Sequence, residues 1–371
     1  MTTDQSANTA LIRRRLPAWY RKHGRDLPWR RSSDPYRVWL SELMLQQTQV
    51  ATVIPYYERF LRRFPDIRRL AAARLESVLR LWSGLGYYAR ARNLHAAAKR
   101  IVAEYDGRFP ETVQELRTLP GIGRYTAAAI ASICFNRRAA VVDGNVARVL
   151  ARLFIIREPI NTAAALTRLQ NLADALIPAR RCGDFNQAMM ELGARVCTPR
   201  NPQCRLCPIR SACGADQSGV VDELPVRKAA APNRTMRFVV LAVERDGRWL
   251  FERRETSGLW GGLWQLPAVE LVDGRSSWSL ARQIAAAHFS TAPRLTRRPT
   301  TRVQWKLTHR DVEFLVHCAE CNGAMVDRGA VSRRVRWMRP RNLHGAPVST
   351  AMRRVVDAVA RAVASAARSS R

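Results

Sequence analysis

The segment Leu119-Pro-Gly-Ile-Gly-Arg-Tyr-Thr126 runs directly into three alanines at residues 127–129, where a helical pattern of small residues begins. Glycines one residue apart let a turn bring backbone N–H groups close to a phosphate, and the following helix N-terminus adds its dipole. Such a contact positions a protein on DNA without reading the base sequence. An ordinary glycine-rich turn between helices is the alternative. The preceding proline and the small-residue helix favour a helix-hairpin-helix motif, with Gly121 and Gly123 at the DNA.

The chain on either side of this segment has apolar residues at helical spacing, separated by proline and glycine. This pattern predicts an all-α domain over residues 11–215. Residues 1–10 are polar, and we expect them to form a disordered N-terminus. They also lack the apolar run of a signal peptide, so nothing indicates secretion. The expected helical runs are Val38–Val50, Leu70–Leu81, Ala89–Tyr105, Tyr125–Cys134 and Val146–Phe154.

The apolar pattern lapses over residues 216–235, which we interpret as a linker, and then changes period. Two strand-like runs, Arg237–Glu244 and Arg248–Arg253, flank Asp246-Gly247, a strong hairpin-turn signal. A helix is expected at Leu280–His288 and a further strand at Val312–Cys318. These elements predict an α+β domain over residues 236–345. Residues 346–371 are rich in Ala and Arg and predict a basic helix or tail.

The composition points to a polyanionic partner. Sixty-two basic residues against thirty acidic ones give a formal net charge of +32, which favours nucleic acid as the partner. Coding bias in a GC-rich genome explains the preference for Arg over Lys, but it does not explain the scarcity of acids. No stretch approaches the ~20 apolar residues of a membrane span, so we expect a cytoplasmic protein without membrane contacts. The length of 371 residues favours two domains.

Four of the eight cysteines lie within seventeen residues, with the spacing Cys197-x6-Cys204-x2-Cys207-x5-Cys213. In an intracellular chain such a group more often binds metal than forms disulfides. Four thiolates suit either zinc or a [4Fe–4S] cluster. Zinc sites usually contain two short cysteine pairs, whereas here one short pair has a single cysteine on either side in a proline-rich loop. The spacing therefore favours the cluster over zinc.

Two carboxylates stand in apolar surroundings. Glu42 lies within Trp39-Leu-Ser-Glu-Leu-Met-Leu45, and burial there would raise its pKa towards that of a usable general acid. The alternative is a glutamate on the exposed face of an amphipathic helix. Asp143 precedes the helix expected at Val146–Phe154, where an aspartate is also a favoured N-cap. On these patterns alone, structural roles for both acids are the simpler interpretation.

These motifs, in this order, resemble the MutY-type adenine DNA glycosylases of the endonuclease III superfamily. The resemblance is dense from about residue 16 to residue 213 and resumes in the second domain. The segments that carry it are Leu27-Pro-Trp-Arg30, Trp39-Leu-Ser-Glu42, Met44–Tyr56, Trp82–Asn93, Leu119–Gly123, Asp143-Gly-Asn145, Phe185–Met190, the four cysteines and Ser257–Trp264.

The resemblance implies base-excision repair of adenine mispaired with 8-oxoguanine or guanine in duplex DNA. Hydrolysis of the N-glycosidic bond requires protonation of the purine, which the resemblance assigns to Glu42 acting as general acid and then as base towards water. It assigns to Asp143 the stabilisation of positive charge on the sugar, and to Asn145 the orientation of Asp143 or of the water. The cysteines would hold a [4Fe–4S] cluster.

Base excision requires the adenine to leave the helical stack. The resemblance places Gln47 and Tyr87 beside 8-oxoguanine and places Trp29, Arg30 and Gln187 in the adenine pocket. At position 125 related enzymes that also cut the strand carry a lysine that forms a Schiff base, whereas this chain has Tyr125. A phenol cannot form an imine, so a monofunctional enzyme without efficient β-lyase activity is expected.

The second domain resembles Nudix hydrolases, but no Arg-Glu-x-x-Glu-Glu run follows Trp264 to hold a catalytic metal. It is therefore expected to recognise 8-oxoguanine without hydrolysing nucleotides. The family's Phe-Ser-His triplet aligns with Leu307-Thr308-His309, which keeps a hydroxyl and the histidine but loses the aromatic ring. The overall expectation is a multidomain monomer: an all-α helix-hairpin-helix glycosylase domain with an Fe–S loop, then an α+β Nudix-like domain.

Two other hypotheses compete. One is a bifunctional pyrimidine glycosylase and lyase of the endonuclease III type, which Tyr125 and the second domain disfavour. The other is a non-catalytic DNA-binding Fe–S protein in which Glu42 and Asp143 are structural. Adenine release from a duplex containing one A:8-oxoguanine pair distinguishes all three.

Overall fold

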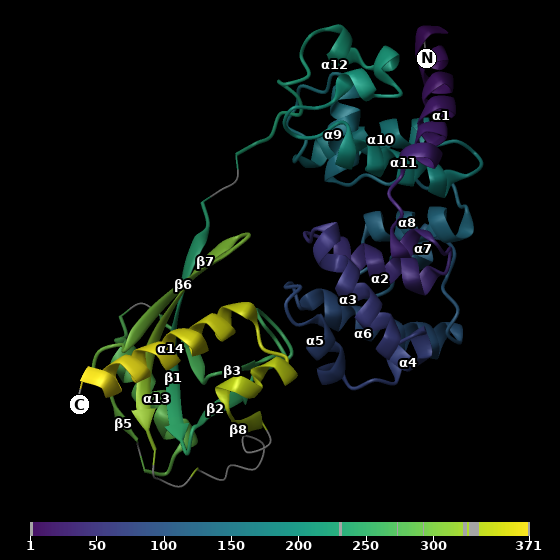
Figure 1. The fold of residues 1–371 in the computed structure, drawn as a ribbon. Coiled ribbons are helices and arrows are strands. Elements are labelled where there is room, and N and C mark those ends of the chain that lie inside the picture. Colours follow the sequence, from purple (N-terminus) through teal and green to yellow (C-terminus); the bar gives the residue numbers. More distant parts are fainter. Residues whose placement is uncertain are drawn as a thin grey trace. The chain divides into compact units, whose positions relative to one another are not determined.

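The structure, a computed structural model, describes residues 3–229, 232–272, 274–291, 293–321, 325 and 334–369. The chain divides into two compact units, one formed by residues 1–72 and 93–230 and the other by residues 73–92 and 231–371. No helix in these described ranges is both long and apolar enough to cross a membrane. The helices of the first part of the chain and the strands of its last part are labelled in Figure 1.

From Thr3 to Gln217 the chain forms helices joined by turns and loops, as expected from the apolar spacing. Several helices begin at a polar side chain that accepts a backbone N–H, as Asp34, Thr112 and Asp143 do. The α-helices are α1 (Thr3–His23), α2 (Pro35–Leu45), α3 (Val50–Arg63), α4 (Ile67–Ala71), α5 (Leu75–Trp82), α6 (Ala89–Tyr105), α7 (Val113–Leu116), α8 (Arg124–Phe135), α9 (Gly144–Leu153), α10 (Ala163–Leu176), α11 (Cys182–Arg195) and α12 (Gly214–Gln217).

Three sequence expectations about this part need correction. The N-terminus is helical from Thr3 onward, because α1 extends further than its apolar residues indicate. The run expected at Val38–Val50 is two helices, α2 and α3, separated by the polar residues 46–49, where Gln47 has a left-handed φ of 55°. The run expected at Leu70–Leu81 is likewise divided between α4 and α5, because Arg74 adopts an extended N-cap conformation.

The core of the first unit lies between helices that are distant in sequence. Helices α1, α9, α10 and α11 contribute buried residues such as Leu16, Leu150, Leu169 and Leu192 to one apolar cluster. Residues after α12 also pack on this unit: Leu224 is buried, its carbonyl accepts a hydrogen bond from Arg152 Nε, and the Val226 carbonyl accepts one from the Ile160 amide. Much of the expected linker is therefore part of the helical unit.

The second unit is built on one mixed sheet. Strand β1 pairs with β2 through the expected turn, in which Asp246 and Gly247 have φ values of 53° and 68°, and it runs parallel to β7. The sheet order is β3-β2-β1-β7-β5, with β4 also on β1, β6 on β7 and β8 on β2. The strands are β1 (Arg234–Arg245), β2 (Arg248–Arg253), β3 (Trp264–Gln265), β4 (Ala268–Glu270), β5 (Arg294–Leu295), β6 (Thr301–Leu307), β7 (Arg310–Glu320) and β8 (Val335–Met338).

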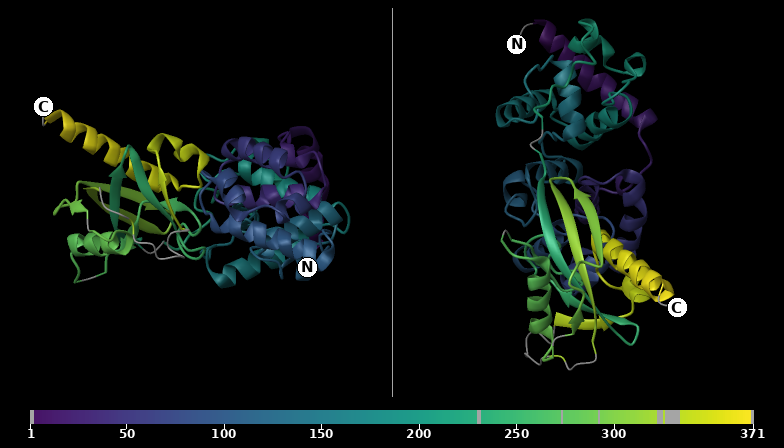
Figure 2. Two further views of the ribbon diagram at one scale, coloured as in Figure 1. Left: turned by 90° about the horizontal axis from the view of Figure 1, so that it is seen from below. Right: turned by 90° about the vertical axis from the view of Figure 1, so that its left-hand side faces the viewer.

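One helix covers each face of the sheet. Side chains alternate along β1, so neighbouring residues pack against different helices. Phe238 and Val240 face α14 (Thr350–Ser369), whereas Val239 and Leu241 face α13 (Ser277–His288). Figure 2 shows the two helices on opposite sides of the strands. The expected boundary at residue 345 is wrong: α14 buries residues such as Val355 against the sheet and completes the second core.

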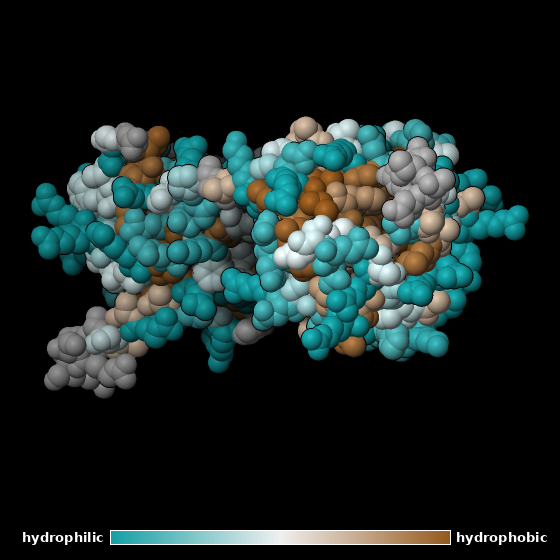
Figure 3. Space-filling model, turned by 90° about the horizontal axis from the view of Figure 1, so that it is seen from above, coloured by the Kyte–Doolittle hydropathy of each residue, from teal (hydrophilic) through white to brown (hydrophobic). Residues whose placement is uncertain are grey.

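The surface agrees with the basic composition. The face seen in Figure 3 is predominantly hydrophilic, with apolar patches between the polar side chains. Among charged side chains in the described ranges, Glu42, Arg90, Arg148, Arg152 and Glu191 are buried. The large positive charge therefore lies mainly at the solvent, where a polyanion can meet it.

Candidate active site

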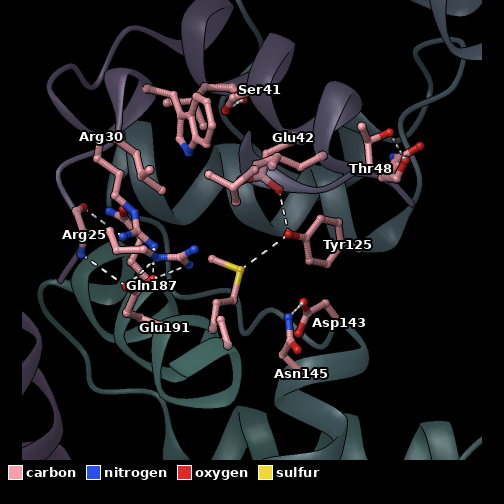
Figure 4. A pocket seen from close by; sticks show the side chains of 18 of the residues that line it. Arg25, Arg30, Ser41, Glu42, Thr48, Tyr125, Asp143, Asn145, Gln187 and Glu191 are labelled. Carbon is pink, nitrogen blue, oxygen red and sulfur yellow. Dashed lines mark hydrogen bonds and ion pairs between the residues drawn. The ribbon is translucent and has the colours of Figure 1, made fainter. Parts of the chain in front are cut away.

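A pocket of about 690 Å³ in the first unit brings together many of the residues that the sequence singled out. Eight of them line it although they come from five separate segments (Figure 4). The break between α2 and α3, which the sequence pattern missed, forms part of the wall. The eight residues are Trp29, Arg30, Glu42, Gln47, Tyr125, Asp143, Asn145 and Gln187.

Glu42 is held on α2 with only 6% of its surface exposed. Its neighbours Leu43 and Met44 belong to the core, so water cannot solvate the carboxylate fully. Burial raises its pKa from 4.5 to about 7; the hydrogen bond from Tyr125 opposes this shift and the nearby charge of Asp143 adds to it. The carboxyl group can therefore hold or release a proton near neutral pH.

Tyr125 lies in the first turn of α8, directly after the glycine hairpin. Its hydroxyl donates a hydrogen bond of 2.6 Å to Glu42 Oε2, as the dashed line in Figure 4 shows. Burial and the adjacent Glu42 raise the pKa of Tyr125 well above its usual value, so the phenol stays neutral and remains a donor. The hairpin thus places a hydroxyl, and no amine, beside Glu42.

Asp143 occupies the N-cap position that the sequence allowed and also lies in the wall of the pocket. It caps α9, because its Oδ1 accepts a 2.7 Å bond from the Val146 amide, and it also lines the pocket. Its Oδ2 accepts a 3.1 Å bond from Asn145 Nδ2. Burial raises the pKa of Asp143, while these hydrogen bonds and the charge of Arg148 act in the opposite direction. The carboxylate is fixed by its own helix terminus.

The hairpin glycines meet different steric environments. Gly121 has a φ of 74°, and a Cβ there would lie 2.5 Å from Asn93 Cβ. Gly123 is the N-cap of α8, with a φ of −82°, and a Cβ added there would meet no atom within 4 Å. The first glycine is required by the turn, and the second leaves the backbone open to a ligand.

The four clustered cysteines line a single small pocket together with Arg152, and none of them is in a disulfide. Arg152 Nη1 donates a 3.3 Å hydrogen bond to Cys197 Sγ. Within the described ranges, no three Cys, His, Asp or Glu side chains converge as ligands of one ion. The four thiol side chains share one pocket, so their chemistry fits a group held by four thiolates.

The remaining predicted residues lie in the second unit. Tyr87 has a left-handed φ of 49° and is 42% exposed. Thr308 and His309 form the turn between β6 and β7. The hydroxyls of Tyr87 and Thr308 are hydrogen-bonded to each other, so two residues predicted to contact the mispair meet in one place.

Comparison with known proteins identifies the family. Residues 40–177 match the HhH-GPD superfamily of base excision DNA repair proteins, and residues 238–358 match the NUDIX domain. The adenine DNA glycosylase of Rattus norvegicus is 37% identical, over 94% of this chain and 78% of its own length. The human adenine DNA glycosylase is 36% identical, over 94% of this chain and 74% of its own length. The chain belongs to the adenine DNA glycosylase family.

Solved structures share the fold of the helical domain. A thermostable thymine-DNA glycosylase is 27% identical with a TM-score of 0.53, covering 58% of this chain and 99% of that one. An endonuclease III in a non-covalent DNA complex shares the fold, with 24% identity, a TM-score of 0.50 and coverage of 59% of this chain and 99% of that one. The chain is thus a DNA glycosylase, a hydrolase of N-glycosyl bonds in base-excision repair.

Two charged residues of the glycosylase pocket, Arg25 and Glu191, were not predicted from the sequence. Glu191 lies one turn after Gln187 on α11 and has no exposed surface. Its carboxylate accepts hydrogen bonds from Arg25 at 2.8 Å and from Arg30 Nη2 at 2.9 Å. These bonds and charges lower its pKa to about 2 against the effect of burial. A signal was present, since Gln187, Met190, Glu191 and Ala194 follow the spacing of one helix face.

Proposed function

We propose that this glycosylase removes adenine paired with 8-oxoguanine or guanine from duplex DNA, without cutting the strand. The observation that carries the proposal is the pairing of Glu42 with Asp143 in one pocket, with the pKa of Glu42 near 7. Two carboxylates with different environments serve as acid and charge stabiliser in glycosidic hydrolysis. The curated relatives named adenine DNA glycosylase support adenine as the base.

The chemistry follows from the two environments. Protonated Glu42 donates its proton to the imidazole nitrogen of adenine, which turns a poor leaving group into a neutral one. Positive charge then develops on the sugar, and Asp143, held by Val146 and Asn145, stabilises it. Ionised Glu42, oriented by the Tyr125 hydroxyl, takes the proton of the attacking water. Bond cleavage and hydration thus restore the starting protonation state.

Recognition of the pair is assigned to residues outside the two carboxylates. Trp29, Arg30 and Gln187 line the same pocket and would surround the extruded adenine. Gln47, with its left-handed backbone, and Tyr87 would fill the space beside 8-oxoguanine, which Thr308 and His309 would contact. Gly121 and Gly123 would position the phosphate backbone. Cys197, Cys204, Cys207 and Cys213 would hold a [4Fe–4S] cluster that anchors the loop they share.

The decisive experiment is single-turnover adenine release by the wild-type protein and by Glu42→Gln. The duplexes carry one A:8-oxoguanine pair, one A:G pair, or one A:T pair as the control. The wild-type protein should release adenine from the first two, and the variant should bind the duplex without releasing adenine, because an amide cannot transfer the proton. Appreciable excision by Glu42→Gln would remove Glu42 from this role.

The monofunctional assignment has its own test at position 125. No lysine lines the pocket, and the four lysines of the chain are Lys22, Lys99, Lys228 and Lys306. Wild-type protein should give no borohydride-trapped DNA adduct at matched excision, whereas Tyr125→Lys should give some, since its amine stands near the abasic sugar. Strong trapping with the wild-type chain contradicts the assignment.

If the four cysteines hold a [4Fe–4S] cluster, we expect the purified protein to be brown and to contain roughly four irons per chain. Metal analysis of protein from iron-replete cells measures this directly. Stoichiometric zinc in place of iron would contradict the cluster.

A further inference from the structure

One tyrosine outside the glycosylase pocket contacts two residues of its wall. Arg30 and Gln187 both line the pocket, and they lie on the same side of it (Figure 4). Tyr20, on α1, does not line the pocket itself, but its hydroxyl donates a 3.0 Å hydrogen bond to Gln187 Oε1. The guanidinium carbon of Arg30 lies 5.3 Å from the centre of the Tyr20 ring. Tyr20 is therefore placed to orient both side chains.

The contact with Tyr20 decides which end of the Gln187 amide is left for a ligand. Burial raises the pKa of Tyr20; the charge of Arg30 opposes this shift and that of Glu191 adds to it. The phenol is thus neutral and carries a proton, for which Gln187 Oε1 is the acceptor within the described part of the chain. Because the amide oxygen is turned towards Tyr20, the polar group of Gln187 left for the pocket is Nε2, which can only donate.

The carboxylate of Glu191 lies in the same part of the wall, but its lone pairs are already used. Its Oε1 accepts from the backbone amide of Arg25 at 3.1 Å and from Arg25 Nε at 2.8 Å. Its Oε2 accepts from Arg25 Nη2 at 2.8 Å and from Arg30 Nη2 at 2.9 Å. A carboxylate has about four lone-pair sites, and these bonds occupy them.

Arg30 completes this part of the wall with further donors. Its Nη1 donates to the Arg25 carbonyl at 3.1 Å, so the guanidinium is held at two of its nitrogens. A guanidinium has five N–H groups and no acceptor, which leaves several N–H groups for a ligand. Gln187 and Arg30 together therefore present hydrogen-bond donors to the pocket, while the neighbouring carboxylate is saturated.

We propose that Tyr20 is a positioning residue for base recognition, which holds the Gln187 amide so that its NH2 group donates to N1 of the extruded adenine. The inference rests on the proposed function. N1 of adenine accepts a hydrogen bond, whereas N1 of guanine carries a hydrogen and donates. A wall of donors fits the first base and leaves the N1–H of the second facing another donor, which is costly in a buried site.

The test measures single-turnover release of adenine and of 1-deazaadenine from duplexes that pair either base with 8-oxoguanine. In 1-deazaadenine a C–H group replaces N1, so the acceptor is lost and the amino group is kept. Tyr20→Phe keeps the ring and removes the hydroxyl, which frees the amide to turn. It should release adenine roughly three- to tenfold more slowly than wild type, with little further loss on the analogue.

The deciding quantity is the rate for adenine divided by the rate for 1-deazaadenine. This ratio should be roughly three- to tenfold higher in the wild-type protein than in Tyr20→Phe. The analogue's own reactivity cancels, because every protein acts on the same two duplexes. Tyr105→Phe is the matched control, since it removes the same hydroxyl from a half-buried tyrosine at the end of α6, outside the pocket. It should keep the wild-type ratio.

An equal ratio in wild type and Tyr20→Phe overturns the inference, whether or not the variant is slower, because a merely structural role slows both substrates alike. A lower ratio in Tyr105→Phe as well overturns it too. Melting temperatures confirm that both variants are folded. A wild-type protein that releases no adenine overturns the proposed function and this inference with it, whereas an active wild type with an unchanged ratio overturns the inference alone.

Discussion

At the scale of single residues, the molecule keeps a carboxyl group where water reaches it poorly. The pKa of Glu42 near 7 results chiefly from burial on α2, and the charge of Asp143 adds a smaller contribution. Such a shift is a stability cost, because the folded protein holds a proton that the unfolded chain releases at a lower pH. Keeping Glu42 as a proton donor in the pocket therefore lowers the free energy of unfolding.

The sign of this cost is testable. The folded pKa of Glu42 is about 7 and its ordinary value is 4.5, so stability falls as pH rises from about 4.5 to 7. Above pH 7 the loss amounts to about 3 kcal/mol. Glu42→Gln should therefore raise the free energy of unfolding more at pH 8 than at pH 5, as measured by denaturant titration at both values. The control is Glu104→Gln, an exposed site on α6. A variant equally stable relative to wild type at both pH values would contradict the buried, proton-holding state.

At the scale of elements, substitution of the two hairpin glycines should have different effects, because Gly121 is sterically confined and Gly123 is not. Gly121→Ala places a Cβ against Asn93 in a left-handed backbone, which should cost at least about 1–2 kcal/mol and lower the melting temperature. Gly123→Ala meets no neighbour and has an ordinary φ, so it should leave the melting temperature unchanged and weaken duplex binding. Calorimetry and a binding titration check each variant. A pure stability loss from Gly123→Ala would disagree with a phosphate contact there.

The side chain of Arg148 connects the pocket with the cysteine loop through hydrogen bonds. Arg148, on α9, is 4% exposed; its Nη2 donates to Asn145 Oδ1 at 2.9 Å and its Nε donates to the Cys197 carbonyl at 2.8 Å. Arg148→Met leaves these partly buried acceptors without their donor, at about 1 kcal/mol each.

We expect Arg148→Met to have a lower melting temperature and slower single-turnover adenine release, because Asn145 no longer holds Asp143 rigidly. Arg168→Met, an exposed site on α10, serves as the control and should behave as wild type does. Excision at the wild-type rate would show that Arg148 does not position Asn145.

At the scale of the whole molecule, we propose that excision and recognition depend on residues of different units. Thr308→Ala combined with His309→Ala should weaken binding and excision of A:8-oxoguanine pairs more than of A:G pairs. The pocket of Glu42 remains intact in this variant, so the rate at saturating enzyme should change less than the affinity. Binding titrations and single-turnover rates on both duplexes measure the difference. Equal losses on the two duplexes would assign these residues to general DNA contact.

The sequence by itself determined whatever depends on local pattern. Helical spacing located α6, α8 and α9 within a residue or two, and Asp246-Gly247 located the β1–β2 turn, because periodicity and turn chemistry act over a few residues. Motif resemblance also selected Glu42, Asp143 and Tyr125, which the structure brings to one pocket.

Only the tertiary structure decided which distant groups meet. The pKa of Glu42 depends on side chains from other helices that exclude water and on Tyr125, which lies 83 residues away. Glu191 becomes important because the fold brings Arg25 and Arg30 to it across 161 or more residues. The sequence of α14 resembles a basic tail. It forms a packed helix because its apolar residues cover one face of the sheet. Burial and long-range pairing depend on how distant segments pack together, so they cannot be predicted from a local sequence pattern.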